Sequence, residues 1–135
     1  MNRRQFIATS AAALAVAPAA FAAADYTPGL VDAELAAGKT VFLDFKASWC
    51  TTCAAQERVI NALKAENPAY EAAITFVNVD WDTYKSAEIT KRLNIPRRST
   101  LVVLKGDREL GRIVAGTGRD EIKALMDTAL TAAAV

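Results

Sequence analysis

The sequence predicts an α/β fold in which helices flank both faces of a central mixed β-sheet. Short segments rich in β-branched and aromatic residues alternate with segments of helical periodicity, which is typical of successive βα units. Two further strand-like segments are separated by a tight turn and followed by an amphipathic segment, which indicates an antiparallel hairpin backed by a helix. The chain has 135 residues, the length of a single domain.

The first half of the domain is predicted to run helix, strand, helix. Residues 28–37 form the first helix, with a proline near its start and a glycine directly after it. Residues 40–47, TVFLDFKA, are short and rich in β-branched and aromatic side chains, so they form a strand. Residues 51–66 form a long helix that an Asn-Pro pair ends. Its apolar residues at helical spacing are Ala55, Val59, Ala62 and Leu63.

The second half is predicted to add three strands and two helices. Residues 74–79, ITFVNV, alternate only partly, as expected of a strand that is covered on both faces. Residues 84–93 form a short helix. Residues 99–104 and 109–114 are strands joined by a Lys-Gly-Asp-Arg turn. Residues 119–130 form the closing amphipathic helix, whose buried stripe is Ile122, Leu125, Met126 and Ala129.

Residues 1–24 are predicted to be an export signal and residues 25–135 the folded domain. Arg3 and Arg4 precede twenty uncharged residues that end in two overlapping A-x-A cleavage patterns. A membrane anchor is the alternative, but alanine inserts weakly and Pro18 interrupts the run. Residues 3–7, RRQFI, resemble a twin-arginine signal, with the general export pathway as the other possibility. Either pathway predicts a periplasmic protein.

Composition excludes several classes of function. The chain has sixteen basic and fifteen acidic residues, and without Arg3 and Arg4 the net charge is near −1. A nearly neutral domain has no field that gathers nucleic acid or an anionic membrane surface, so we expect neither as a partner. The absence of histidine excludes Ser-His and Cys-His activation, histidine metal sites and haem ligation by imidazole. We therefore expect no metal and no cofactor.

The only two cysteines lie in residues 49–53, WCTTC, where a predicted strand meets a predicted helix. At a helix N-terminus, the sulfur of Cys50 meets unpaired backbone N–H groups and the positive end of the helix dipole, which favour thiolate over thiol. Cys53 is three residues further on, on the same helical face and within disulfide reach. This spacing predicts a redox-active disulfide with Cys50 as the nucleophile and Cys53 as the resolving thiol.

Other uses of the two cysteines are weaker or excluded. A purely structural disulfide would close a very small loop and stabilise little. Zinc needs four ligands, and a c-type haem site needs histidine where Ala54 stands. Two thiolates suit the soft ion Cu(I), so a Cu(I)-binding or metallochaperone-type protein is the alternative function.

The sequence resembles the thioredoxin family over nearly all of residues 30–130. The matching segments are residues 41–53 (VFLDFKASWCTTC), Asn78-Val79-Asp80, residues 100–106 (TLVVLKG) and the closing helix. Within the family it is most similar to bacterial periplasmic thioredoxin-like proteins and to the C-terminal domain of DsbD-type thiol:disulfide interchange proteins. The resemblance implies a thioredoxin-like fold and dithiol exchange with disulfide-bearing client proteins. It also implies a reductant that a membrane electron donor of the DsbD/CcdA type recharges.

Two residues near the cysteines also match the family. Asp44 corresponds to the family's buried acid, and its position inside VFLDF independently predicts a pKa raised by desolvation. Such a group suits proton exchange with Cys53, directly or through water. The alternative is a surface aspartate paired with Lys46. Trp49 matches the family's tryptophan and is expected to shield the dithiol.

The family normally has a cis-proline immediately before the Thr-Leu of the third strand, and here Ser99 occupies that place in the sequence. Either the loop is rebuilt around Pro96, or serine takes the position with a trans peptide bond, because a cis bond without proline is costly. The family's loop donates backbone hydrogen bonds to clients, so Ser99 and Arg98, with Trp49, are the expected client-binding residues. The arginines of this loop, Arg97 and Arg98, would lower the pKa of Cys50, attract acidic clients, or remain solvated without effect.

We expect electrons to flow from this protein to its clients. A strong oxidant needs a heavily stabilised thiolate. With two threonines between the cysteines and no histidine, that stabilisation should be moderate. The sequence therefore predicts a periplasmic reductase of protein disulfides, and we expect a monomer.

Overall fold

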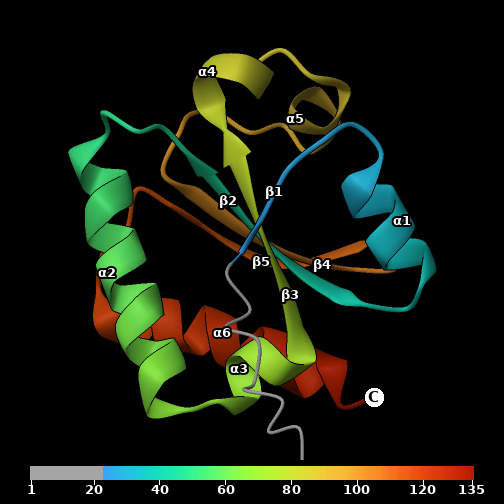
Figure 1. Ribbon diagram of the computed structural model, residues 1–135, viewed down its shortest axis with the longest axis vertical. Coiled ribbons are helices and arrows are strands. Elements are labelled where there is room, and N and C mark those ends of the chain that lie inside the picture. The colour runs from blue at the N-terminus through green and yellow to red at the C-terminus, as the bar shows by residue number, and fades with distance from the viewer. Residues whose placement is uncertain (1–22) are drawn as a thin grey trace, which may run out of the picture.

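The computed structural model describes residues 23–135, which form one β-sheet between two layers of helices (Figure 1). The strands are β1 (Ala24–Asp25), β2 (Thr40–Lys46), β3 (Ile74–Asp80), β4 (Thr100–Lys105) and β5 (Arg108–Val114). The helices are α1 (Leu30–Ala36), α2 (Thr51–Glu66), α3 (Ala69–Ala73), α4 (Trp81–Tyr84), α5 (Glu88–Arg92) and α6 (Arg119–Ala133).

The sheet is mixed, with strand order β1-β3-β2-β4-β5. The central strand β2 runs parallel to β3 and antiparallel to β4. The hairpin of β4 and β5 closes through Gly106 and Asp107, and Gly106 has the positive φ of 60° that such a two-residue turn uses. The predicted mixed sheet with helices on both faces is confirmed.

The alternation of side chains along β2 explains why both faces are covered. Phe42 faces α2, α3 and α6 and packs with Leu63 and Met126. Leu43 points to the other face, where α1 and α5 cover it and Val31 and Ile89 pack in the same cluster. Asp44 and Lys46 share the Phe42 side of the strand and therefore lie under α2, the helix that begins at the cysteines.

Most predicted elements are confirmed, and the differences are local. Residues 84–93 were expected to be one helix, but α4 ends at Tyr84 and α5 starts at Glu88. Helix α4 begins at Trp81, before the predicted start, because Asp80 caps it: the Asp80 side chain accepts a hydrogen bond from the Thr83 N–H at 3.1 Å. The short elements β1 and α3 were not predicted. Strand β1 is defined by its pairing with β3, and a local sequence pattern does not show with which distant strand a segment pairs.

The two long helices differ in how well their buried faces were predicted. In α6 the expected stripe, Ile122, Leu125, Met126 and Ala129, is buried. In α2 the buried residues are Cys53, Gln56, Ile60 and Leu63. The polar Gln56 therefore lies in a face whose other members are apolar or cysteine, whereas Ala62 is exposed.

The predicted export signal lies outside the described residues, except for Ala23 and Ala24. Ala24 belongs to β1 and pairs with Val77 of β3. Within residues 23–135, no helix has the length and apolar character needed to span a bilayer.

Candidate functional site

The two cysteines form a disulfide at the start of α2, which confirms that they are within bonding reach. Their Cα atoms are 5.2 Å apart, inside the usual range for a disulfide. Cys50 is the N-cap of the helix, and its Sγ accepts a hydrogen bond from the Cys53 N–H at 3.1 Å. The sulfur of Cys50 thus occupies the position where the helix directs its unpaired N–H groups and positive dipole end.

The two sulfur-bearing residues are not equally accessible. Cys50 is 5% exposed and Cys53 is 1% exposed. The short exposed segment around Trp49 precedes the pair, and the body of α2 follows it. Both residues are nearly enclosed, Cys50 slightly less than Cys53.

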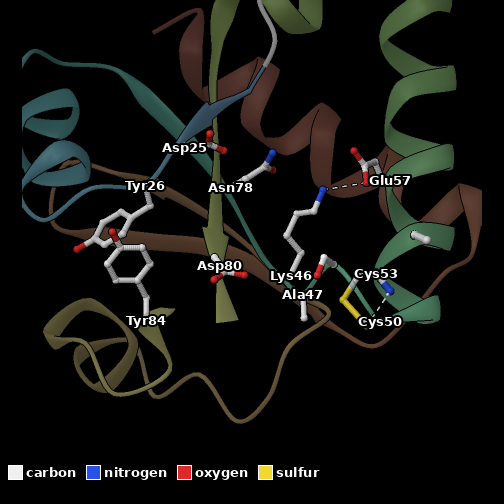
Figure 2. A pocket seen from close by; sticks show the side chains of 12 residues that line it. Asp25, Tyr26, Lys46, Ala47, Cys50, Cys53, Glu57, Asn78, Asp80 and Tyr84 are labelled. Carbon is white, nitrogen blue, oxygen red and sulfur yellow. Dashed lines mark hydrogen bonds and ion pairs between the residues drawn. A yellow bond between two sulfur atoms is a disulfide. The ribbon is translucent and has the colours of Figure 1, made fainter. Parts of the chain in front are cut away.

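A pocket of about 380 Å³ opens beside the disulfide (Figure 2). Near the sulfurs its wall carries an ion pair in which Lys46 Nζ donates to Glu57 Oε2 at 2.8 Å. Farther from the disulfide, Tyr26 and Tyr84 meet edge to face with ring centroids 4.8 Å apart. The approach to Cys53 on this side is polar and charged.

Asp44 is buried on the α2 side of the sheet, with 5% of its surface exposed. Its pKa is raised to about 7, chiefly because burial disfavours the charged form; Lys46 opposes this change, Glu57 adds to it and Lys64 opposes it. The Oδ1 atom is enclosed and has no hydrogen-bond partner among residues 23–135. The alternative of a surface aspartate paired with Lys46 was wrong, because Lys46 pairs with Glu57 and Asp44 is inside.

Trp49 projects beside the disulfide and is 56% exposed. Its Nε1 donates to Asp82 Oδ2 of α4 at 2.8 Å, and the Arg98 guanidinium carbon lies 4.4 Å from the ring centroid. The ring is therefore fixed from two sides while more than half of it faces solvent. Trp49 and Arg98, which the sequence assigned to one site, are in contact.

Ser99 occupies the position facing the cysteines, and the loop is not rebuilt around Pro96, which is exposed. The Ser99 Oγ lies 3.2 Å from Cys50 Sγ and 3.1 Å from Cys53 Sγ. No peptide bond among residues 23–135 is cis, as expected for serine at this place. The residue has a φ of 65°, the left-handed conformation that non-glycine residues rarely adopt.

Gln56 is a residue of this site that the sequence reasoning missed. It is fully buried in α2, and its Nε2 donates to the carbonyl oxygens of Ser99 at 2.9 Å and Gly116 at 3.0 Å. The available signal was its spacing from Cys53, Ile60 and Leu63, which places a glutamine on the buried stripe of the helix.

Within the described part of the chain, no group of three or more Cys, Asp and Glu side chains is arranged to hold a metal ion. The disulfide at the helix start and the buried acid, whose pKa is about 7, support the chemistry of a dithiol–disulfide couple.

Comparison with known proteins agrees with this arrangement. Residues 24–128 match the family described as Thioredoxin. Thioredoxin H2-1 of Oryza sativa subsp. japonica is 32% identical over 99 residues, covering 73% of this chain and 67% of the relative. Thioredoxin-1 of Drosophila yakuba is 33% identical over 90 residues, covering 67% of this chain and 77% of the relative.

Solved structures show the same fold. The crystal structure of Trxlp from Edwardsiella tarda has a TM-score of 0.65 and 28% identity, covering 78% of this chain and 96% of that one. The structure of a mutant thioredoxin from Entamoeba histolytica has a TM-score of 0.63 and 25% identity, covering 79% of this chain and 99% of that one. The chain belongs to the thioredoxin family, and its Cys50–Cys53 pair makes it a thiol:disulfide oxidoreductase.

Proposed function

We propose that the protein is a periplasmic reductase of protein disulfides in which Cys50 attacks the client and Cys53 resolves the intermediate. The observation that carries the assignment of roles is the position of Cys50 Sγ at the N-cap of α2, where it accepts the Cys53 N–H. A thiolate at this position is stabilised by the helix terminus. Cys53 lies inside the helix and is less exposed, which suits a thiol that acts only after the client is bound.

The exchange has two steps. In the first, the Cys50 thiolate bonds to one sulfur of a client disulfide, and the other client sulfur leaves as a thiolate. In the second, the Cys53 thiolate bonds to Cys50 Sγ and displaces the first client sulfur, also as a thiolate. The client has then gained two electrons, and the protein carries the Cys50–Cys53 disulfide seen in the structure.

Asp44 is proposed to take the proton of Cys53 before the second step, through intervening water. A carboxylate with a pKa of about 7 is close to half-ionised at neutral pH, so it can both accept and return a proton. Glu57 and Asn78 line the pocket beside Cys53 and also a second pocket that contains Asp44. These shared residues support a polar route between the two groups.

Trp49, Arg98 and Ser99 are proposed to bind the client. Trp49 offers an exposed aromatic surface next to Cys50, and Arg98 places a positive charge against it. The backbone N–H and C=O of Ser99 are occupied by Phe45 and Ala115, at 2.7 and 2.8 Å. Arg98 O already accepts from Arg97 Nε at 3.0 Å, so we propose that Arg98 binds the client strand through its backbone N–H and that Ser99 contributes its side chain.

Location and electron supply rest on the N-terminal sequence and on family likeness. Residues 1–24 have the charge and A-x-A pattern of an export signal, which supports a periplasmic location. A periplasmic protein with this dithiol would need an electron donor in the membrane to restore its thiols, and we propose a donor of the DsbD/CcdA type. The resemblance of the sequence to the C-terminal domain of DsbD-type proteins supports this choice. We propose that it acts as a monomer.

The roles of the cysteines are tested with a disulfide-linked client and a chemical reductant. We expect the wild-type protein to accelerate client reduction, and Cys50→Ala to abolish the acceleration. Cys53→Ala should instead accumulate a mixed disulfide between Cys50 and the client, visible on a non-reducing gel. Full activity of the Cys50 variant, or trapping by Cys50→Ala rather than by Cys53→Ala, would reverse the assignment.

The location is tested by expressing the full chain in a bacterium and measuring the mass of the product in the periplasmic fraction. Cleavage after Ala22 or Ala24 supports the export signal. Replacing Arg3 and Arg4 with lysine separates the pathways, because only receptor-read twin-arginine export depends on that pair. Retention of the uncleaved wild-type chain in the cytoplasm would contradict the proposal.

The same two sulfurs support the alternative function of Cu(I) binding, since the reduced pair is a soft two-thiolate site. Equilibrium dialysis of the reduced protein with Cu(I) distinguishes the two functions. Stoichiometric, tight uptake without disulfide reductase activity would favour the copper-binding function over the reductase.

A further inference from the structure

We propose that Ser99 is a catalytic residue whose hydroxyl donates a hydrogen bond to whichever cysteine carries the negative charge, and that Gln56 positions it. The proposal deepens the proposed function, because it takes Cys50 as the attacking thiolate. It assigns the serine a part in the exchange itself, in addition to any contact with a client.

The first support is the geometry at the sulfurs. Neither sulfur of a disulfide carries a hydrogen, so at 3.2 and 3.1 Å the Ser99 hydroxyl is the donor toward Cys50 and Cys53. One hydroxyl has a single hydrogen, so it donates to one sulfur at a time. With nearly equal distances to both, a rotation of the hydroxyl transfers the hydrogen bond from one sulfur to the other.

The second support is the burial of the serine. Ser99 is fully buried, and within residues 23–135 its Oγ has no hydrogen-bond partners except the two sulfurs. A hydrogen bond to a thiolate in such an enclosed place is stronger than one to a neutral sulfur, because the acceptor is charged. The hydroxyl therefore stabilises the reduced, ionised pair more than it stabilises the disulfide.

The third support is the strained backbone of Ser99 and the hydrogen bonds that hold it. Its φ of 65° is unfavourable for a residue with a side chain, and such strain persists only where surrounding contacts fix it. Three hydrogen bonds do so: Ser99 N–H to Phe45 O at 2.7 Å, Ala115 N–H to Ser99 O at 2.8 Å, and Gln56 Nε2 to Ser99 O at 2.9 Å.

Gln56 connects this loop to the helix that carries the cysteines. It lies one turn after Cys53 on the buried face of α2, and its Nε2 also donates to Gly116 O at 3.0 Å. The side chain thus ties the segments that enter β4 and leave β5 to the same helix. Among residues 23–135, the hydrogen bonds of Gln56 Nε2 go to Ser99 O and Gly116 O and not to a sulfur, so Gln56 is a positioning residue for Ser99.

The test measures the thiolate and the redox equilibrium without any client. The pH dependence of Cys50 alkylation gives its pKa, and equilibration with reduced and oxidised glutathione gives the stability of the disulfide. In Ser99→Ala we expect the Cys50 pKa to rise by about one unit. At a pH below the wild-type pKa, the variant should then contain about tenfold less Cys50 thiolate than the wild type. The glutathione equilibrium should shift about tenfold toward the disulfide, which corresponds to about 30 mV.

Two further variants separate the hydroxyl from the backbone. Ala115 has a φ of 64° in the same site, so alanine is compatible with this conformation in the domain. Ser99→Gly also removes the hydroxyl but relieves the strain, and it should shift both quantities as Ser99→Ala does. Thr100→Val removes the neighbouring hydroxyl, which donates to Arg97 O at 2.7 Å and not to sulfur, and should shift neither.

Gln56→Met tests the positioning role with a side chain of similar length that cannot donate. It should shift the Cys50 pKa in the same direction by a smaller amount, and should add nothing in the Ser99→Ala background. An additive effect would assign Gln56 a role independent of Ser99. The proposal would be overturned if both Ser99 variants left the Cys50 pKa and the glutathione equilibrium unchanged. It would also be overturned if Thr100→Val shifted these two quantities as much as the Ser99 variants do. Either result holds whether or not the protein reduces clients.

Discussion

Lys46 and Glu57 form an ion pair beside the disulfide, with Nζ and Oε2 2.8 Å apart. Lys46 follows Asp44 by two residues in β2, so both side chains point toward α2. Lys46 pairs with Glu57 instead, and none of the ion pairs among residues 23–135 includes Asp44. Burial is therefore the main influence on the acid, and its pKa is raised to about 7.

The first prediction is that Asp44→Asn makes the oxidised protein more stable at alkaline pH. The pKa of Asp44 is raised in the folded protein, so folding favours the protonated form. This contribution is complete below pH 4 and is lost as the pH rises through 7. The rise of the Asp44 pKa from 3.8 to about 7 corresponds to roughly 4 kcal/mol. The variant should therefore gain up to that much over the wild type at pH 8, and nothing below pH 4.

Urea unfolding of the oxidised proteins at several pH values measures this difference. Asp107→Asn is the matched control, because it makes the same chemical change at an exposed place in the β4–β5 turn. A stability difference between Asp44→Asn and the wild type that stays constant from pH 4 to 8 would show that Asp44 is not a buried acid.

The second prediction concerns the resolving step. If Asp44 accepts the Cys53 proton, release of a client from the mixed disulfide should speed up as the pH rises through about 7. Asp44→Asn should lower this rate by roughly 10² at pH 7, the usual contribution of a general base. The measurement is single-turnover release from a preformed mixed disulfide. An unchanged rate and pH profile in the variant would remove Asp44 from the mechanism.

The third prediction concerns the core beneath the sheet. Met126 is fully buried in α6 among Phe42, Leu63 and Ile122. Met126→Ala should lower the free energy of unfolding by about 2–5 kcal/mol, since it removes buried apolar surface and leaves a cavity. Thr131→Ala, at an exposed position in the same helix, should change it by less than about 0.5 kcal/mol. Alanine has the highest helix propensity, so a loss as large in Thr131→Ala as in Met126→Ala would show that the burial of Met126 is not its cause.

The elements that the sequence predicted well are those with strong local signals. Helix α2 has its predicted bounds because its periodicity is long and a prolyl stop follows it. The buried stripe of α6 follows from spacing alone. Placing Cys50 at a helix start needed only a strand pattern before it and a helix pattern after it.

What the sequence could not predict depends on contacts between distant segments. Strand β1 is two residues long and is defined by its pairing with β3. The partner of Lys46 could not be chosen from β2 alone, because the competing Glu57 lies in α2. The hydrogen bonds of Ser99 with both sulfurs depend on a left-handed backbone that Phe45, Gln56 and Ala115 impose from three other segments.

The last prediction addresses client choice. Arg98 stacks on Trp49 at 4.4 Å, so an acidic residue beside a client disulfide would meet a positive charge next to Cys50. Arg98→Gln should lower kcat/KM about two- to fivefold for a peptide with a glutamate next to its disulfide, in line with the modest worth of a partly exposed charge pair. A matched peptide with glutamine should be unaffected, and added salt should weaken the discrimination shown by the wild type.

Arg97→Gln is the control for this prediction. It removes an equal charge from the same loop and leaves the stacking of Arg98 on Trp49 in place, although it also removes the hydrogen bond from Arg97 Nε to Arg98 O. An equal loss for both peptides in Arg98→Gln would mean that the arginine acts by packing on the tryptophan. An equal loss for the acidic peptide in the two variants would point to the general charge of the loop. If kcat/KM for the acidic peptide falls in Arg98→Gln and not in Arg97→Gln, the Trp49–Arg98 pair is the feature that recognises the charge of the client.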